Sequence, residues 1–589
     1  MERPDRTIPL RVSLTATGAV AGLALWVIAE LLPDVIQNGR AILAVATAAA
    51  GFFGPLMIML GPLTPSRALA GAGLIAVPLS ILATSASMRF ETVGAFVETG
   101  HPIAAMVLSA TLPIPYLIAG LGQGRRWMHY PTLFGVAWQA TVRSAAAVLF
   151  LGLFWLILYL SDALLQLVGI ELIDWINTVE ALPFILSGLV LGLGAAVAFE
   201  LSNVLSPMLP IRLLRLLLPI VLAVTAVFLG GLALRGLGRI FGDLSIAASL
   251  ITMSAAAALL VSAAVDGEDA SAVRGRLMQR ATAALALIVP GLAGLAIYSV
   301  TERVSQYGWS PDRLAALSAA VVMMAYGVAY AVAILPGAGW MARIRQANGA
   351  VALAALALAI AWLSPLLNPQ RLSAANQVAR FEAGTVPAEA LDLWAIGREW
   401  GRPGAAALDR LVAVAGGEDR GVLEDRRVAL SASDSRYAFE NRVPPRVQAE
   451  TLMALRNAIP VRPAGAELPT DLFARETPDQ VARLTEACNR RTPGGNPGCL
   501  AARLDLWPGR QSEQFVIFTM ITREVVHAFG PAPNEEGPLV RLRPAWLGTT
   551  TNAQLQAEII DTLLEGRYQL GPPALNALEF GGTSLLLLP

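Results

Sequence analysis

The chain has no lysine, only two cysteines and three histidines in 589 residues, and only 15% of its residues are charged. A soluble domain ordinarily carries about a quarter charged residues, so this composition excludes a typical water-soluble protein. The net charge of +0 gives no basic footprint for nucleic acid. We therefore expect no nucleic-acid partner. Histidine and cysteine do not occur at metal-ligand spacing, so we expect no metal site, and we also expect no cofactor.

Apolar sequence dominates instead: 55% of the residues are hydrophobic and the mean hydropathy is +0.59. A helix needs about twenty apolar residues to cross a bilayer, and continuous runs without strict alternation favour helices over a barrel. The bilayer is therefore the expected partner. The predicted spans are residues 12–32, 41–61, 67–87, 102–121, 142–160, 181–199, 211–234, 244–265, 281–300, 313–335 and 348–367.

The composition changes near Asn368-Pro369, after which charge and polarity are those of a globular domain. We predict an all-α polytopic transmembrane bundle of about eleven helices at 1–367, followed by a soluble α+β domain at 368–589. One helix is predicted to start at Thr477, and another is predicted at about 553–565. Strands are expected at Arg427 to Ala432, Phe515 to Met520 and Leu585 to Leu588.

Arginine in short loops indicates which side of the membrane a loop occupies, because positive loops stay in the cytoplasm. With the N-terminus inside, the inside segments contain Arg3, Arg6, Arg11, Arg67, Arg125, Arg126, Arg212, Arg215, Arg274, Arg276, Arg280, Arg343 and Arg345. The outside loops contain fewer arginines, and the odd span count places the C-terminal domain outside, in a periplasm or its equivalent.

The two cysteines, Cys488 and Cys499, flank a turn-rich loop in this C-terminal domain. An oxidising compartment favours a bond between them, so we predict a disulfide, with two unrelated buried thiols as the alternative.

Two stretches are distinctive: Arg303-Val-Ser-Gln-Tyr-Gly-Trp-Ser-Pro-Asp-Arg313, and Leu367-Asn-Pro-Gln-Arg-Leu-Ser-Ala-Ala-Asn-Gln-Val-Ala-Arg380. Together they resemble the bacterial inner-membrane proteins of the domain-of-unknown-function 4153 family. The resemblance implies an inner-membrane location and this topology, and it implies no mechanism.

The first stretch also has the signals of a helix start, with Ser310 as cap and Pro311 at the first position. A sharper hypothesis is a polar external site at which the first stretch contacts the second. Its candidate residues are Arg303, Gln306, Tyr307, Arg313, Arg371, Gln377 and Arg380.

Charge within membrane helices usually marks an ion or proton pathway, and the predicted helix centres have almost none. Glu200, followed by Asn203, is the best transport candidate, although a position near a helix end favours an interfacial role. Glycines at four-residue spacing, Gly18/Gly22 and Gly188/Gly192, allow close helix packing.

The soluble domain carries no recognisable catalytic motif. We therefore expect a non-catalytic envelope protein that interacts with a partner, such as another envelope protein, or senses a ligand. A transporter or channel is the main alternative, and a polar, water-accessible cavity within the membrane would favour it. A membrane-bound enzyme acting on an envelope lipid or glycan is the second alternative. The oligomeric state stays open.

Overall fold

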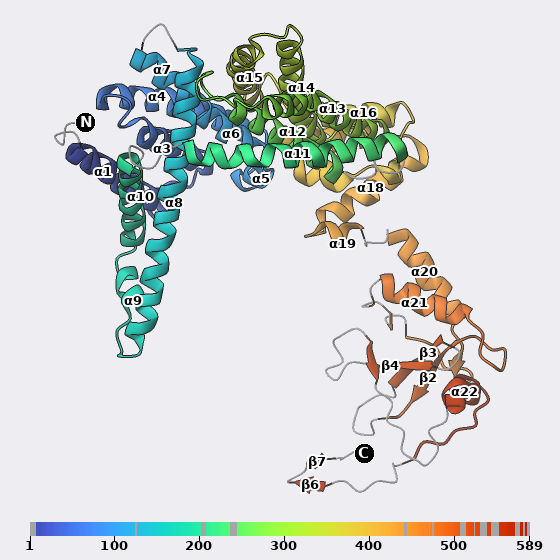
Figure 1. Ribbon diagram of the computed structural model, residues 1–589. Coiled ribbons are helices and arrows are strands. Elements are labelled where there is room, and N and C mark those ends of the chain that lie inside the picture. Colours follow the sequence, from blue (N-terminus) through green and yellow to red (C-terminus); the bar gives the residue numbers. More distant parts are fainter. Residues whose placement is uncertain are drawn as a thin grey trace. The chain divides into compact units, whose positions relative to one another are not determined.

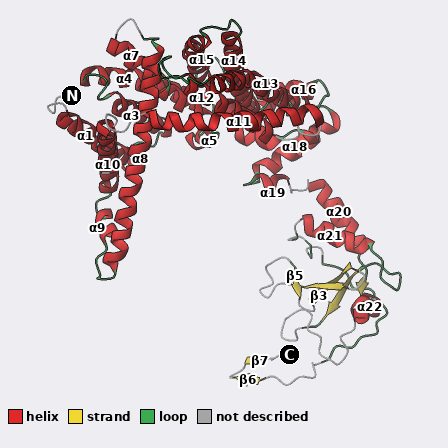
Figure 2. Ribbon diagram, in the orientation of Figure 1, coloured by secondary structure: helices red, strands yellow, loops and turns green. Residues whose placement is uncertain are grey.

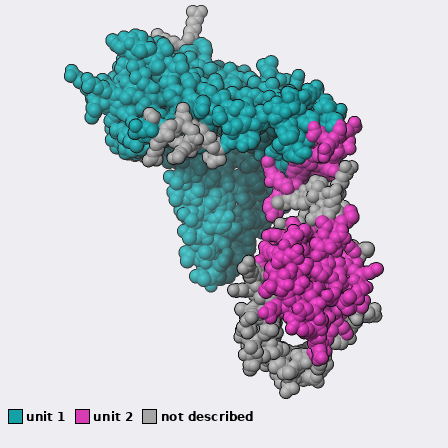
Figure 3. Space-filling model, turned by 90° about the vertical axis from the view of Figure 1, so that its right-hand side faces the viewer, with its two compact units in different colours: residues 1–416 teal, residues 417–589 magenta. Residues whose placement is uncertain are grey.

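The computed structural model describes residues 7–123, 127–201, 208–235, 244–440, 445–469, 472–473, 476, 478–506, 514–522, 525–530, 539–542, 553–571, 578–580 and 583–585. The chain divides by its contacts into two compact units, residues 1–416 and 417–589, which Figure 3 shows in different colours. Figure 2 shows that the strands all belong to the second unit.

Unit 1 is built of helices, labelled in Figure 1. They are α1 (Thr7–Trp26), η2 (Val27–Leu31), α2 (Leu32–Val35), α3 (Gly39–Met59), α4 (Pro65–Ser87), α5 (Val93–Glu98), α6 (His101–Thr111), α7 (Pro113–Gln123), α8 (Tyr130–Gln166), α9 (Leu172–Asn177), α10 (Ala181–Leu201), α11 (Met208–Arg235), α12 (Leu244–Val265), α13 (Arg276–Tyr307), α14 (Pro311–Ile334), α15 (Trp340–Leu363), α16 (Pro369–Glu382), η5 (Ala388–Ala390), η6 (Ala395–Glu399) and α17 (Gly401–Val414).

Within the described residues, eleven helical segments are long and apolar enough to cross a membrane, which confirms the predicted fold class. Their ends differ from the sequence prediction. The fifth segment is 37 residues long, Tyr130–Gln166, because α8 extends beyond the predicted span at both ends, and its C-terminal part forms a hairpin with α9 and α10 (Figure 1). The eleventh begins at Trp340, eight residues before the predicted start, because the helix includes polar residues that precede the apolar run, among them Arg343, whose Nε donates to the carbonyl oxygen of Ala333 at 2.8 Å.

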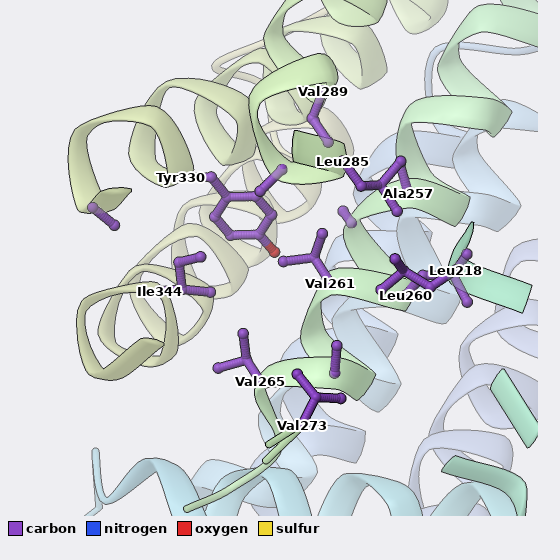
Figure 4. Packing of buried hydrophobic residues seen from close by; sticks show 14 residues of the cluster. Leu218, Ala257, Leu260, Val261, Val265, Val273, Leu285, Val289, Tyr330 and Ile344 are labelled. Atoms are coloured by element: carbon purple, nitrogen blue, oxygen red, sulfur yellow. The ribbon is translucent and has the colours of Figure 1, made fainter. Parts of the chain in front are cut away.

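Apolar side chains from α11 to α15 form one core of the bundle (Figure 4). Val261 of α12, Val289 of α13 and Tyr330 of α14 are buried together there. Helices α1 and α10 approach more closely, since a Cβ on Gly18 would lie 2.1 Å from the carbonyl oxygen of Gly188. The glycine spacing in the sequence therefore corresponds to a backbone contact that any side chain would block.

Unit 2 contains α18 (Gly417–Ser431), α19 (Arg436–Glu440), α20 (Pro445–Ala458), β1 (Val461–Arg462), α21 (Pro478–Asn489), β2 (Cys499–Leu504), β3 (Gln514–Thr522), β4 (Val525–Gly530), β5 (Val540–Leu542), α22 (Ala553–Leu564), β6 (Leu578–Phe580) and β7 (Thr583–Leu585). A five-stranded sheet has the order β1-β2-β3-β4-β5, parallel only between β1 and β2. Strands β6 and β7 form a separate antiparallel pair.

Alternation along β2 determines what each sheet face packs against, because successive side chains point to opposite faces. Cys499 and Ala501 share a core with Leu484 of α21. Leu500 faces the other way and shares a core with Ile560 of α22. The sheet is therefore covered by helices on both faces.

The predicted strand at Arg427 to Ala432 is wrong, because residues 427–431 form the end of α18 and Ala432 follows in a turn. Leu423 and Leu430, seven residues apart, are buried on one face, and a spacing of seven residues, about two helical turns, is typical of a helix. The strand predicted at Phe515 to Met520 is confirmed within β3. The helix predicted at 553–565 is confirmed as α22.

The contact boundary at residue 416 lies beyond the composition change at Asn368. Helix α16 packs on α14, and the backbone N–H of Arg402 donates to the carbonyl oxygen of Arg89 at 2.8 Å. The polar helices α16 and α17 therefore belong to the first compact unit.

Candidate anion-binding site

The turn between α13 and α14 packs against α16 through hydrogen bonds that satisfy backbone groups. The side chain of Gln377 donates to the carbonyl oxygens of Tyr307 at 2.9 Å and Trp309 at 3.2 Å. Asn376 accepts from the backbone N–H of Trp309 at 2.9 Å. We call the residues 307–309, 376, 377 and 380 the turn–helix joint.

Arg380 completes the joint at the C-terminus of α13. Its guanidinium donates to the carbonyl oxygens of Gln306 at 2.9 Å and Ser305 at 3.2 Å. These carbonyls belong to the last turn of the helix, which lacks intrahelical donors and carries the negative end of the helix dipole. Arg380 is therefore a helix cap supplied from another element.

Gly308 is the point of closest approach in the joint. Its φ of +76° favours glycine, and an added Cβ would lie 2.6 Å from Nε2 of Gln377 and 2.8 Å from Cδ of Arg380. The turn therefore has both a backbone and a packing requirement for glycine at this position.

The other candidates of the first stretch surround the ring of Tyr307. The guanidinium carbons of Arg303 and Arg313 each lie 5.5 Å from the ring centroid. Arg313 also donates to the carbonyl oxygen of Gly308 at 2.8 Å, and Arg303 donates to the side chain of Gln306 at 3.3 Å. These side chains are brought together, and their contacts hold the turn.

Arg371 lies away from the joint, where α16 begins. Asn368 caps this helix by accepting from the backbone N–H of Arg371 at 3.0 Å, so the arginine is fixed in the first turn. Its side chain lines a cavity of about 410 Å³ together with Arg89 and Arg402. The remaining lining residues are Ser85, Met88, Pro365, Asn368 and Pro403. We call this space the arginine cavity.

The arginine cavity collects positive charge from three separated parts of the chain. Arg89 follows the end of α4, Arg371 lies in the first turn of α16, and Arg402 lies in the first turn of α17. Both helix N-termini add positive potential to that of the guanidinium groups. None of the described residues lining the cavity is a carboxylate, so its electrostatics suit an anion.

Arg89 is the buried member, with only 8% of its surface exposed. One of its terminal nitrogens, Nη2, donates to the carbonyl oxygens of Trp362 at 2.9 Å and Ser364 at 2.6 Å, at the C-terminal end of α15. Burial lowers the pKa of Arg89 to about 10, which leaves it protonated at neutral pH. Arg89 therefore contributes a fixed positive charge to the residues that line the cavity.

A second polar cluster, which sequence reasoning missed, lies inside the membrane bundle. Tyr330 donates to Oδ1 of Asn348 at 2.6 Å, and Nδ2 of Asn348 donates to the hydroxyl of Tyr130 at 2.9 Å. Tyr130 and Asn348 line a cavity of about 570 Å³, whose wall also includes Ser262 and Tyr326. Most of the lining side chains are apolar, such as Ile114 and Leu133, so the space between the spanning helices is largely apolar with one polar cluster in its wall.

Two ion pairs hold the α12–α13 loop next to this cluster, one with a buried aspartate (Asp266) and one with an exposed aspartate (Asp269). Arg215 pairs with Asp266, and Arg345 pairs with Asp269 at 2.8 Å. Arg345 also donates to the carbonyl oxygen of Val265 at 2.9 Å. The sequence signal was the acidic run from Asp266 to Asp269 in an otherwise arginine-rich set of loops.

The comparison with known families covers most of unit 1. The family described as Domain of unknown function (DUF4153) matches residues 41–411. The chain belongs to this family. Its matched region begins in α3 and ends in α17, so it contains both the turn–helix joint and the arginine cavity. No curated protein and no solved structure matches the chain.

In this DUF4153 protein the transport candidate Glu200 is an ion-pair partner. Both of its carboxylate oxygens accept from Arg11, with Nε at 2.6 Å from Oε1. The pair links the ends of α1 and α10. Asn203 lies outside the described residues.

Cys488 and Cys499 are joined by a disulfide, which links the end of α21 to the start of β2. The loop between them is held from α22, where Asp561 accepts from the hydroxyl of Thr492 at 2.6 Å and from the backbone N–H of Gly494 at 2.9 Å. Among the described residues of the DUF4153 protein, no group of histidine, cysteine or acidic side chains is arranged to hold a metal ion.

Proposed function

We propose that this protein is a non-catalytic envelope protein that senses or interacts with an anionic ligand at the outer face of its membrane bundle. The observation that supports the proposal is the convergence of Arg89, Arg371 and Arg402 on one cavity without a lining carboxylate. A site of this kind binds by charge-assisted hydrogen bonds and needs no reacting side chain.

The proposed location is a bacterial inner membrane, with the N-terminus in the cytoplasm and residues 368–589 in the periplasm. Support comes from the arginine distribution over the predicted loops and from the eleven candidate spans. The cysteine pair in the C-terminal part fits an oxidising compartment. In this orientation the arginine cavity opens on the periplasmic side.

Binding of inorganic pyrophosphate to the purified protein, measured by calorimetry, tests the proposal. Arg402→Gln should weaken binding about tenfold, because a charge-assisted hydrogen bond of an exposed side chain contributes near the lower end of the usual range. Arg420→Gln is the control, since Arg420 is an exposed arginine that pairs with Glu424 on α18. Equal affinities in both variants and the unaltered protein would refute the proposal.

Transport is the second candidate function, and the 570 Å³ cavity beside Tyr130 and Asn348 favours it. Ala352 lines this cavity, so Ala352→Cys in a background with both native cysteines replaced reports its access to water. Labelling by a membrane-impermeant maleimide from either side of the membrane would support a transport path. Labelling from neither side would remove this candidate.

A further inference from the structure

We propose that the ligand of the arginine cavity is an anionic amphiphile with one acyl chain, whose tail lies in the groove between α16 and α17. This inference rests on the proposed function and specifies its ligand. It assigns a separate role to each of two adjoining spaces: charge recognition in the arginine cavity, and burial of hydrocarbon in the groove.

The groove has a volume of about 530 Å³ and walls made of small apolar side chains. It is lined at helical spacing by Ala374, Ala375, Val378 and Ala379 of α16, and by Ala406 and Ala407 of α17. The two helices pack on each other through the buried Ala374, Val378 and Ala407, and the groove runs along this contact, flanked by exposed alanines. We call it the α16–α17 groove.

The α16–α17 groove adjoins the arginine cavity, because Arg371 and Pro403 line both. From Arg371 to Glu382 the groove follows α16 for about 16 Å, at about 1.5 Å per residue. That length is close to one leaflet of hydrocarbon, about half of a 30 Å bilayer core. One acyl chain therefore matches the groove in length.

The charges at the two ends give the groove a direction. At the far end, Arg410 pairs with Glu382 at 3.1 Å, which neutralises both. At the near end, the guanidinium groups of Arg89, Arg371 and Arg402 have no lining carboxylate. An anionic headgroup therefore has one favourable end, and the chain behind it meets apolar walls.

An acyl chain suits these walls better than a peptide does. Between its charged ends the groove presents alanine, valine and proline side chains, which neither donate nor accept hydrogen bonds. The helix backbones behind them are bonded internally. A peptide in the groove would leave its own backbone groups unsatisfied, at considerable cost, whereas methylene groups lose nothing.

The test compares two ligands that share a phosphate headgroup: lysophosphatidic acid with a twelve-carbon chain, and glycerol 3-phosphate, which has no chain. The full-length protein is held in nanodiscs of zwitterionic lipid, and empty nanodiscs correct for partition of the chain. The amphiphile should bind at least about tenfold more tightly, since burial of two methylene groups already gives a factor of that size.

Two variants separate the two spaces. Ala406→Trp fills the groove and should reduce amphiphile affinity to that of glycerol 3-phosphate, while the affinity for glycerol 3-phosphate stays unchanged. Val414→Trp is the control on the same helix, because Val414 is exposed and does not line the groove. Arg402→Gln should weaken both ligands.

The outcomes distinguish this inference from the proposed function. Equal affinities for the two ligands, or an unchanged amphiphile affinity in Ala406→Trp, would overturn the acyl-chain inference. A loss of both ligands in Arg402→Gln would then still support an anion site for free phosphate. If Arg402→Gln changes neither ligand, both proposals fail.

Discussion

Replacing Gly308 by alanine tests whether the turn–helix joint contributes to stability. The backbone at this position has φ +76° and ψ −177°, a conformation almost confined to glycine. The new methyl group would also meet Gln377 at 2.6 Å and Arg380 at 2.8 Å, both of which donate to carbonyls of this turn. The substitution therefore disturbs the backbone and the packing of α16 together.

The expected loss is about 2 to 6 kcal/mol in the free energy of unfolding of unit 1. Backbone strain contributes about 1–3 kcal/mol. Displacing Gln377 removes its bonds to the carbonyl oxygens of Tyr307 and Trp309, each worth about 0.5–1.5 kcal/mol. Thermal unfolding of the purified protein in detergent should show a clearly lowered midpoint.

Gly337→Ala is the matched control for this experiment. Gly337 has φ +77° at the other end of α14, and nothing lies within 4 Å of its added Cβ. The Gly337→Ala variant should lose only the part of the unfolding free energy that comes from backbone strain. If Gly308→Ala and Gly337→Ala lower the midpoint equally, the contacts with α16 contribute nothing and our account of the joint is refuted.

Three further predictions follow from other parts of the molecule. Replacing Cys488 and Cys499 by serine should lower the free energy of unfolding of unit 2 by about 3 kcal/mol, because the disulfide closes a loop across a sequence separation of 11 residues and so restricts the unfolded chain. Denaturant unfolding measures this loss, and an unchanged free energy of unfolding would contradict the prediction. Although burial raises the pKa of Asp561, hydrogen bonds from Thr492, Asn496 and the N–H of Gly494 lower it overall. The carboxylate therefore stabilises the folded state above its unfolded pKa near 3.8, and this stabilisation is lost as pH falls through the lower folded pKa. In Asp561→Asn the free energy of unfolding should consequently depend less on pH over this acidic range. Reporter fusions after Arg11 and Pro589 should place the two ends on opposite sides of the membrane, and the same side for both would contradict the span count.

Periodic and local features were accessible from the sequence. The apolar runs identified the membrane-spanning helices, because the length of a span is set by the bilayer. The cap at Ser310 was also readable: its hydroxyl accepts from the backbone N–H of Arg313 at 3.2 Å, with Pro311 at the first position. Such features depend on neighbours within one turn of helix.

The candidate site depends on tertiary structure. Arg89 is separated from Arg371 and Arg402 by some 300 residues, and only the packing of α16 and α17 on the bundle brings their side chains to one cavity. Sequence placed Arg371 with the joint, whereas the helical rotation between Arg371 and Gln377 directs them to different neighbours. Ion pairs such as Arg345–Asp269 depend on the same kind of long-range contact. The sequence by itself thus determined which segments enter the membrane, since hydrophobicity is a local property, and the tertiary structure decided which charges meet, since that depends on how separate helices pack.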